Sequence, residues 1–328
     1  YAITHSSRRL LAKCKLWDKL LSDLIPFDHL NIIDYELNNS ARFNLKDLNN
    51  KDLDYSSLGW IIDHQKLMSL FLETIRTDKS INKIPTSVIP NTHNYDLIVV
   101  ADGSKSNVKK RLNIPSFSFN YDQVCITAKV LLRGTKFKEA FEILTSEGPF
   151  AVLPLGGDLF QIICSTSTEK NLYLKNLPNY LFLDYLATIL PYGIEPDTLI
   201  EEPKSFPIQF LLNYFLFSGK FIFVGESAHV VHPVAGQGLN LCWRDVNTLT
   251  NIVARRILKN KSSIFIPIVY SFSRYIDILS VLFITDSLVR FSRANSRLFY
   301  ISRTLTFYSL KKFSLIRKII LNIFTNGI

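Results

Sequence analysis

The sequence predicts an α/β protein in which a mostly parallel sheet is interrupted by an inserted, mainly antiparallel β domain and followed by C-terminal helices. Residues 95–101 and 221–224 are short apolar runs without alternation, which is typical of parallel strands buried on both faces. Residues 117–212, between these runs, contain alternating strand patterns instead. Beyond residue 260 the apolar residues recur mainly at helical spacing.

The N-terminal part alternates between strand and helix signals. Residues 1–19 predict a short extended lead followed by a helix with leucines on one face. Residues 30–35 and 41–45 alternate, so we expect a β-hairpin that turns near Asn38 and Asn39. A strand at 58–64 and an amphipathic helix at 65–76 follow.

The middle of the chain is predicted to begin with a loop at 77–94 and to continue with the strand at 95–101 and a basic helix at 107–112. The inserted β domain then contains strands at 124–130, 147–155 and 159–165. Three residues are candidates to line an apolar cavity, with packed core as the alternative for each: Phe150, Val152 and Leu153.

Composition indicates a globular protein of two domains. The chain has 328 residues, 47% of them hydrophobic and 20% charged. Its four cysteines form no C-x-x-C pair, which is typical of buried thiols in a reducing compartment. No secretory signal is recognised in residues 1–12, and no uncharged apolar run approaches the roughly 18 residues of a membrane span. The net charge of +10 fits nucleic acid, an anionic membrane or an anionic cofactor, so its location decides between them.

The most informative stretch is residues 220–245. The apolar strand at 221–224 leads into Gly225 and then into a loop stiffened by Pro233. Two glycines, Gly236 and Gly238, permit a close approach of the backbone just where a helix begins. The N-terminus of a helix presents N–H groups and a positive dipole end, so this loop suits a ligand with negative charge.

A second loop has the same design. The strand at 95–101 runs into the sequence Asp102-Gly103-Ser104-Lys105-Ser106, and a helix follows. Gly103 permits a tight turn, and the serines offer hydroxyl groups at a helix N-terminus.

In this order and spacing, the two loops resemble the flavin motifs of FAD-dependent aromatic hydroxylases, and most closely those of the UbiH-type ubiquinone-biosynthesis branch. The strings "Thr-Asp-x-Leu" at 285–288 and "Gly-Pro-Phe-Ala-Val-Leu-Pro-Leu" at 148–155 resemble the same branch. The resemblance implies a Rossmann-like FAD-binding domain, like that of para-hydroxybenzoate hydroxylase, with the inserted sheet as the substrate domain. The FAD-binding residues that it implies are Asp102, Gly103, Ser104, Ser106, Gly225, Glu226, Pro233, Gly236, Gln237, Gly238, Leu239 and Asn240.

Three features depart from the family pattern. Glu226 stands where the family usually has Asp, and Cys242 stands where it commonly has Gly. The G-x-G-x-x-G motif with which the family begins is absent from residues 1–328. The resemblance therefore implies that the first βαβ unit precedes Tyr1, and we expect residues 1–328 alone to hold FAD weakly.

The resemblance implies that NAD(P)H reduces FAD and that the reduced flavin and O2 deliver an oxygen atom to the aromatic ring of a quinone precursor. The sequence identifies no catalytic side chain and no metal ligand. His232, beside Pro233, is a candidate to face the flavin, whereas His229 is expected to be structural. Two alternatives remain open: oxidation or reduction of an isoprenoid on the same scaffold, and a non-catalytic relic.

We predict four segments: the first part of the FAD-binding domain (1–112), the substrate-binding sheet (113–217), the second part of the FAD-binding domain (218–260) and a C-terminal helical region (261–328).

The C-terminal segment is expected to dock on an anionic membrane surface. It interleaves apolar residues with positive charge, without the length to span a bilayer, and the alternative is that its apolar face packs on the protein's own core. We therefore expect a cytoplasmic protein, peripheral on the inner face of a membrane and within reach of a quinone-biosynthesis complex, with no nucleic-acid partner. Eight basic residues follow Asp286 with no further acidic residue: Arg290, Arg293, Arg297, Arg303, Lys311, Lys312, Arg317 and Lys318.

Overall fold

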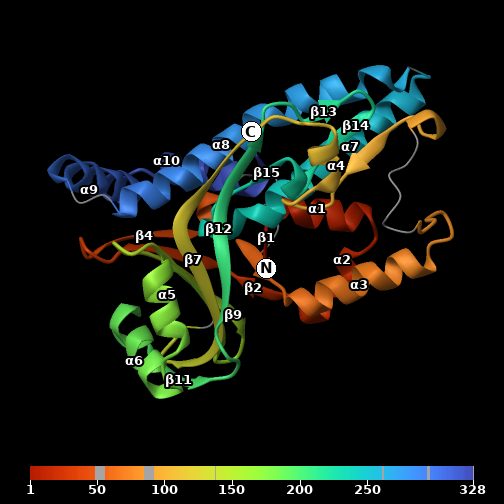
Figure 1. The fold of residues 1–328 in the computed structure, drawn as a ribbon. Coiled ribbons are helices and arrows are strands. Elements are labelled where there is room, and N and C mark those ends of the chain that lie inside the picture. Colours follow the sequence, from red (N-terminus) through yellow and green to blue (C-terminus); the bar gives the residue numbers. More distant parts are fainter. Residues whose placement is uncertain (49–55, 85–91, 137, 261, 294–295, 328) are drawn as a thin grey trace.

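The computed structural model describes residues 1–48, 56–84, 92–136, 138–260, 262–293 and 296–327 (Figure 1). Their strands form one large sheet and two small ones, with the longest helices grouped on one side of the molecule. This is the expected α/β architecture. Part of the loop expected at 77–94 lies outside the described residues.

The large sheet has nine strands in the order β15-β12-β7-β10-β9-β8-β3-β4, and β11 pairs with β7 beside this path. Its pairs are antiparallel except for β3 with β8. The strands predicted at 124–130, 147–155 and 159–165 all lie in it. The strands are β3 (His29–Asp34), β4 (Asn39–Asn44), β7 (Ser116–Arg133), β8 (Glu139–Leu144), β9 (Pro149–Gly156), β10 (Leu159–Ser167), β11 (Glu195–Leu199), β12 (Lys204–Asn213) and β15 (His229–Val230).

The predicted hairpin is present, and it belongs to the large sheet. Strands β3 and β4 pair in register from His29 opposite Asn44 to Asp34 opposite Asn39. Strand β3 then pairs in parallel with β8, which adds the hairpin to the large sheet. The division of the chain into four segments stays a prediction, and this pairing cuts across its first boundary at residue 112.

One of the two small sheets contains the strands that lead into the two predicted flavin loops. The sheet without these strands has the order β1 (Ala2–Ile3), β5 (Gly59–Ile61), β2 (Ile25–Phe27). The other has the order β13 (Phe217–Ser218), β14 (Phe221–Phe223), β6 (Ile98–Val100), and β14 runs parallel to β6 as predicted. Strand β6 is shorter than the predicted 95–101, and Val99 is 47% exposed. The expectation that this strand is buried on both faces is therefore wrong at that residue.

Two groups of helices cover different sheets. Helices α7 and α8 pack together over β14 and form a core with Phe223, Leu241, Tyr270 and Ile278. Helices α5 and α6 cover the other end of the large sheet (Figure 1). The helices are α1 (His5–Lys13), α2 (Trp17–Leu20), α3 (His64–Thr77), α4 (Asn107–Arg111), α5 (Thr168–Lys175), α6 (Asn179–Ile189), α7 (Gln237–Leu258), α8 (Ile266–Arg293), α9 (Arg297–Lys312) and α10 (Ser314–Asn326).

Helix α8 is largely apolar on both its buried and its exposed face, and its buried face also holds charged residues. Its buried face includes Arg274 and Asp277, whereas large apolar side chains lie on its exposed face. The segment Ser263–Arg293 is long and apolar enough to cross a membrane by length and composition alone. The sequence criterion did not select it because charged residues interrupt the apolar run. We call its exposed apolar residues the α8 stripe: Ile268, Val269, Phe272, Ile276, Leu279 and Phe283.

The C-terminal helices α9 and α10 pack one face on the protein. Phe307, Leu310 and Leu321 join a core cluster with Phe43 and Leu144. Three of the predicted membrane-facing cations form ion pairs within the protein instead: Arg290 with Asp286, Arg303 with Asp34, and Arg317 with Asp47. The core-packing alternative therefore accounts for one face of this segment.

Candidate functional site

The structure brings the two predicted loops together at one end of the β6–β14 pair. Val224 N donates a hydrogen bond to Val100 O at 3.0 Å, and Ser227 Oγ donates to the same carbonyl at 2.7 Å. Because the strands are parallel, the chain leaves both at the same edge. The loops after Val100 and Val224 are therefore neighbours, which is the arrangement typical of cofactor sites in open α/β sheets.

Hydrogen bonds between side chains of the first loop and backbone N–H groups of α4 shape this loop. Asp102 is exposed, and its Oδ2 accepts a hydrogen bond from Asn107 N at 3.1 Å. Gly103 has φ +83°, a conformation that favours glycine, and Ser104 is half-buried. Ser106 is the N-cap of α4, where its Oγ accepts from Lys109 N at 3.0 Å. Its hydroxyl therefore already has a structural role.

The second loop begins with a glycine that no other residue replaces easily. Gly225 has φ +61°, and a Cβ atom there would lie 3.2 Å from Cys242 Sγ. Cys242, the departure from the family pattern, thus packs directly against Gly225. Glu226 is exposed at the surface of this loop.

A buried ion-pair network attaches this loop to α7 and α8; we call it the α7–α8 seam. The carboxylate of Asp245 accepts from Gly225 N at 2.8 Å, from His229 Nε2 at 2.8 Å and from Arg274 Nε at 2.7 Å. Burial alone would raise the pKa of Asp245, but these three partners outweigh it and the pKa is lowered. His229 is therefore a structural residue here, as expected.

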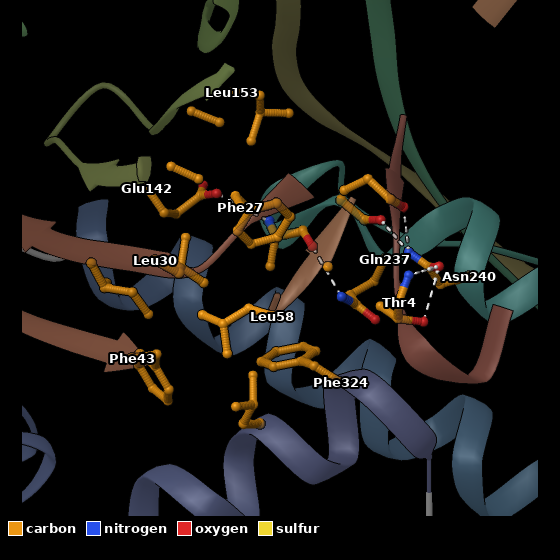
Figure 2. A pocket seen from close by; sticks show the side chains of 18 of the residues that line it. Thr4, Phe27, Leu30, Phe43, Leu58, Glu142, Leu153, Gln237, Asn240 and Phe324 are labelled. Carbon is orange, nitrogen blue, oxygen red and sulfur yellow. Dashed lines mark hydrogen bonds between the residues drawn. The ribbon is translucent and has the colours of Figure 1, made fainter. Parts of the chain in front are cut away.

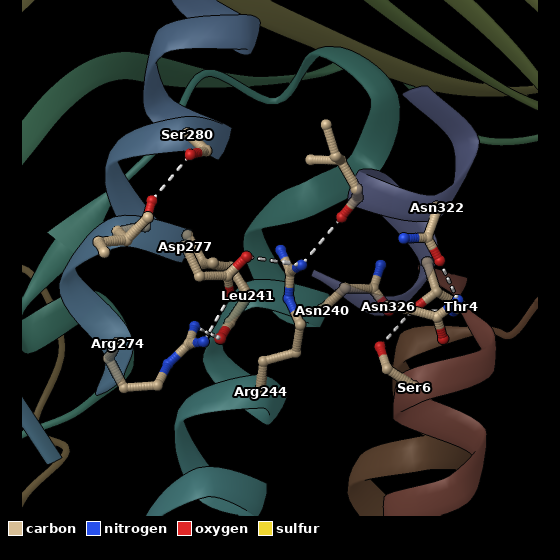
Figure 3. Close-up of polar contacts among 12 residues, drawn as sticks. Thr4, Ser6, Asn240, Leu241, Arg244, Arg274, Asp277, Ser280, Asn322 and Asn326 are labelled. Atoms are coloured by element: carbon tan, nitrogen blue, oxygen red, sulfur yellow. Dashed lines mark hydrogen bonds and ion pairs between the residues drawn. The ribbon is translucent and has the colours of Figure 1, made fainter. Parts of the chain in front are cut away.

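The seam continues through Asp277, on which two arginines converge (Figure 3). Arg274 Nη1 and Arg244 Nη1 both donate to its carboxylate, at 2.5 and 3.1 Å. Arg244 also donates to Ile323 O of α10 at 3.0 Å. Four buried charges, two of each sign, are thus paired between α7 and α8.

The loop at 233–240 places a left-handed turn directly before α7. Ala235 and Gly236 have φ +58° and +60°, and Gly236 is the N-cap of the helix. A Cβ atom on Gly236 would lie 3.3 Å from Ala2 Cβ. A Cβ atom on Gly238 would meet only Val231 Cγ2, at 3.9 Å. The space in front of Gly238 is therefore open in the described structure, while Gly236 is closely covered.

Asn240 ties the N-terminal segment to this loop. Its Oδ1 accepts from Thr4 N at 3.0 Å and from Ser7 Oγ at 2.7 Å, and its Nδ2 donates to Ala2 O and Gly236 O at 2.9 and 3.1 Å. The side chain is fully buried. Its bonding capacity is thus used within the protein, so Asn240 acts by positioning the loop. In contrast, Oε1 of the adjacent Gln237 is buried without a hydrogen-bond partner among the described residues.

A deep apolar cavity opens beside this loop (Figure 2). It holds about 1080 Å³ of empty space, part of it open to solvent. Residues of the large sheet, of the small sheet that contains β1, and of α8 and α10 surround it. Of the three predicted cavity residues, Leu153 lines the cavity, whereas Phe150 and Val152 point into the core cluster on the opposite face of β9.

One carboxyl group interrupts the apolar lining. Glu142 on β8 lies in a cross-strand row between Ile32 of β3 and Ala151 of β9, and Ala140 and Leu144 line the cavity on either side of it along the strand. Burial raises the pKa of Glu142 to about 7, opposed by a hydrogen bond from Ala235 N to Oε2 at 3.4 Å. The Glu142 side chain therefore changes between its neutral and its charged form near neutral pH.

His232 does not lie at the cavity surface. It is fully buried, its Nδ1 accepts from Val234 N at 3.2 Å, and its ring packs edge-on against Tyr121 with centroids 5.0 Å apart. Burial lowers its pKa to about 3. The prediction that it is a candidate to face the flavin therefore finds no support in its packing, and it stays neutral at ordinary pH.

Sequence reasoning missed Glu142, although a signal was present. In the run Ala140-Phe141-Glu142-Ile143-Leu144, a strand with period two places Glu142 on the same face as two apolar residues. A carboxylate in such a position is either paired or perturbed.

Comparison with known proteins identifies the fold and the family. Residues 91–263 match the family described as "FAD binding domain". The uncharacterized protein slr1300 of Synechocystis sp. is 26% identical over 273 residues, which covers 77% of this chain and 65% of that protein. The mitochondrial ubiquinone biosynthesis monooxygenase COQ6 of Dictyostelium discoideum is 25% identical over 320 residues, which covers 76% of this chain and 64% of that protein. The chain thus spans just under two thirds of the length of these relatives.

Solved structures show the same fold. The p-nitrophenol 4-monooxygenase PnpA from Pseudomonas putida DLL-E4 superposes with a TM-score of 0.75 at 14% identity, covering 98% of this chain and 86% of that one. At that identity the likeness concerns the fold alone, and it confirms the predicted fold class.

Proposed function

The chain belongs to the FAD-binding domain family, and from this premise we propose that it is an FAD-dependent monooxygenase that hydroxylates an aromatic quinone precursor with NAD(P)H and O2. One observation carries the proposal: the apolar cavity is bordered directly by the loop at 233–240, at the N-terminus of α7. A hydroxylase needs a dry pocket for an aromatic ring at the reactive face of its flavin.

The residues at this loop fit a flavin. Gly238 faces open space, Gln237 has an unused acceptor, and the first turn of a helix of 22 residues presents its N–H groups here. Pro233, Gly236, Gln237, Gly238 and Leu239 would hold the ring system, with Asn240 fixing the loop from behind.

The loops at 102–106 and 225–226 are proposed to hold the remainder of the cofactor. Asp102 and Glu226 both have exposed carboxylates suited to hydroxyl groups of the ribose or ribityl chain. Gly103 and Gly225 supply the turns that bring these carboxylates to one edge of the sheet.

FAD, when bound, supplies the redox chemistry and the activation of O2. The protein's own contribution is position and polarity. Backbone N–H groups at the start of α7 stabilise negative charge on a bound ring, and the apolar cavity walls exclude water.

The substrate is proposed to be a hydroxylated aromatic ring with an apolar tail. The cavity walls are almost entirely aliphatic and aromatic, and α10 contributes Ile320, Leu321 and Phe324 to them. The similarity to a ubiquinone biosynthesis monooxygenase supports the same class. In a strain that lacks the gene, the unhydroxylated precursor should accumulate, and its mass identifies the ring; an accumulating isoprenoid without a ring would contradict the proposal.

Access to such a substrate is proposed to come from peripheral docking on an anionic membrane. The α8 stripe supplies apolar contact area, with Phe272 79% and Phe283 74% exposed. Exposed cations lie near both ends of α8, Arg255 and Lys259 before it and Arg293 at its end. Apolar side chains flanked by cations match the interface of an anionic bilayer.

The cofactor site can be tested in a form of the protein that purifies with FAD bound, by Gly238→Val with Thr250→Val as the matched control. Thr250 is an exposed residue of the same helix, so both variants place the same side chain on α7. We expect the Gly238 variant to keep its melting temperature within a few degrees but to lose FAD measured by absorbance, because valine occupies the open space. The Thr250 control and Glu226→Asp should retain FAD. Normal FAD content in a folded Gly238→Val protein would contradict the loop assignment.

A further inference from the structure

Glu142 forms no ion pair with any residue that the structure describes. Of the described residues that line the cavity, it is the one with an ionisable side chain. Glu139, three residues away on the same strand, is paired with Arg42 at 2.7 Å. The side chain of Glu142 is only 7% exposed, so an ionised Glu142 is largely shielded from bulk water and forms no ion pair with the described residues.

Two other titratable side chains in this part of the protein, Cys125 and His232, are kept uncharged near neutral pH by burial. Burial raises the pKa of the Cys125 thiol on β7 to about 12, with a further contribution from Glu142 itself. Burial lowers the pKa of His232 to about 3. Tyr121 and Asp286 are hydrogen-bonded to each other at 2.9 Å. A change in charge inside the cavity near pH 7 therefore belongs to Glu142.

The position of Glu142 connects the two walls of the proposed active site. It comes from the large sheet, yet its Oε2 accepts a long hydrogen bond, 3.4 Å, from Ala235 in the proposed flavin loop. Figure 2 places it among the apolar side chains at the cavity wall. One weak bond leaves most of the acceptor capacity of the carboxylate for a ligand.

We propose that Glu142 is a catalytic residue that binds a ring hydroxyl of the substrate and takes up its proton. This inference rests on the proposed function and names the substrate class: an uncharged hydroxyaromatic compound rather than a ring that carries a carboxylate. The O–H bond of the substrate breaks, the proton moves to a carboxylate oxygen of Glu142, and the electron pair stays on the substrate oxygen. The same proton returns to the product, so no other reactant is needed.

The chemistry follows from having one negative charge in a dry cavity. A carboxylate there is relieved of its unfavourable burial when a hydroxyl group donates to it. Transfer of the proton moves the charge onto the ring, which becomes richer in electrons at the carbon that receives oxygen. A carboxylated substrate would bring a second negative charge beside Glu142, with no lysine or arginine among the described lining residues to neutralise it.

The first experiment compares a 4-alkylphenol with its methyl ether as ligands of the FAD-loaded protein between pH 5.5 and 8.5. The two probes differ in the hydroxyl proton that Glu142 is proposed to bind. In the wild type, we expect phenol affinity to rise about tenfold as Glu142 ionises, and the phenol to bind about ten- to a hundredfold more tightly than the ether at pH 8.5.

Two variants make this comparison specific. Glu142→Gln preserves shape and the acceptor for Ala235 N but removes the charge, so it should lose the pH dependence and most of the preference for the phenol. Glu147→Gln is the matched control, because Glu147 is exposed in the turn between β8 and β9. It should behave like the wild type.

Turnover supplies an independent readout. Glu142→Gln should keep its FAD and its reduction by NAD(P)H, but hydroxylation should fall about 10²- to 10⁴-fold and the acidic limb of the kcat/KM profile should disappear.

Two outcomes would overturn the inference while leaving the proposed function intact. One is equal binding of phenol and ether by the wild type at every pH, and the other is an unchanged pH-dependent preference in Glu142→Gln. A wild-type protein that binds FAD but neither probe would instead contradict the proposed function, and the inference would fall with it.

Discussion

Ionisable side chains are buried to a similar depth in two regions of the molecule, with opposite consequences. In the α7–α8 seam, Asp245, Asp277, Arg244 and Arg274 pair with one another across two helices. In the cavity, Glu142 has one weak hydrogen-bond partner and no counter-charge among the described residues. The pKa of Asp245 is lowered despite burial, whereas that of Glu142 is raised to about 7.

The difference separates structural charges from reactive ones. A paired buried charge keeps its protonation state and fixes geometry, here the position of the loop at 225–229. An unpaired one sits near the balance between charged and neutral forms, which is the condition for moving a proton at neutral pH.

Breaking the seam should have the largest effect. Asp245→Asn removes the charge that compensates Arg274, so we expect a loss of about 3–5 kcal/mol in the free energy of unfolding. Urea denaturation measures it, with Asp184→Asn on the exposed face of α6 as the control, expected within about 0.5 kcal/mol. A loss below about 1 kcal/mol in Asp245→Asn would mean that the seam does not hold the loop.

Neutralising Glu142 should act in the opposite direction. Its folded pKa of about 7 lies above the ordinary 4.5, so the folded state retains its proton longer than the unfolded state. The wild type is therefore destabilised progressively as pH rises from 4.5 through 7, by about 3 kcal/mol at about 1.36 kcal/mol per pKa unit.

Glu142→Gln lacks this penalty. Its stability should match that of the wild type near pH 4.5 and exceed it by up to about 3 kcal/mol at pH 8.5. Denaturation at the two pH values measures the gap, and a variant less stable than the wild type at pH 8.5 would assign Glu142 to the structural class.

The contrast between these two regions also shows what the sequence could predict. Helices, strands, the β3–β4 hairpin and the glycine turns at Gly103, Gly225 and Gly236 follow from local patterns and were predicted from them. Residues within a few positions of one another determine the conformation of these elements, so local sequence patterns can predict them.

Features that depend on distant segments were not predicted. No local signal specifies that β3 pairs with β8, more than 100 residues away, and this pairing is what encloses the cavity around Glu142. The rule that apolar faces turn inward also fails on α7, where Val246 is exposed while Asp245 is buried, because the partners of Asp245 on α8 outweigh the gain from burying valine.

His232 provides a third case with the reverse pH dependence. Its folded pKa of about 3 lies below the ordinary 6.5, so the unfolded state binds a proton first as pH falls. The contribution of neutral His232 is complete above pH 6.5 and is lost as pH falls toward 3, by about 2 kcal/mol between pH 6.5 and 5.

On going from pH 7 to pH 5, the wild type should therefore lose about 2 kcal/mol of stability relative to His232→Gln. Thermal melts at both pH values measure it. An equal difference at pH 7 and pH 5 would mean that the folded protein binds this proton, which contradicts the burial of the ring.

The smallest effect on stability is expected on the opposite face of the same helix that carries the seam. Phe272 and Phe283 of the α8 stripe are exposed, so Phe272→Ser and Phe283→Ser should change the free energy of unfolding by no more than about 0.5 kcal/mol.

If the stripe enters a membrane, each phenylalanine contributes about 1.5–3 kcal/mol of apolar burial there, so the double variant should lose most of its recovery in flotation with anionic vesicles. Leu172→Ser is the control, since Leu172 is also an exposed apolar residue, lies on α5 and is remote from α8 (Figure 1). Point substitutions are preferable to deleting residues 303–328, because that segment contains Phe307, Leu310 and Leu321 of the core.

Binding of the wild type should fall with salt, since the flanking cations contribute electrostatically. Recovery that is equal for neutral and anionic vesicles, or unchanged in the double variant, would remove the membrane from the proposal and leave the stripe without an assigned role.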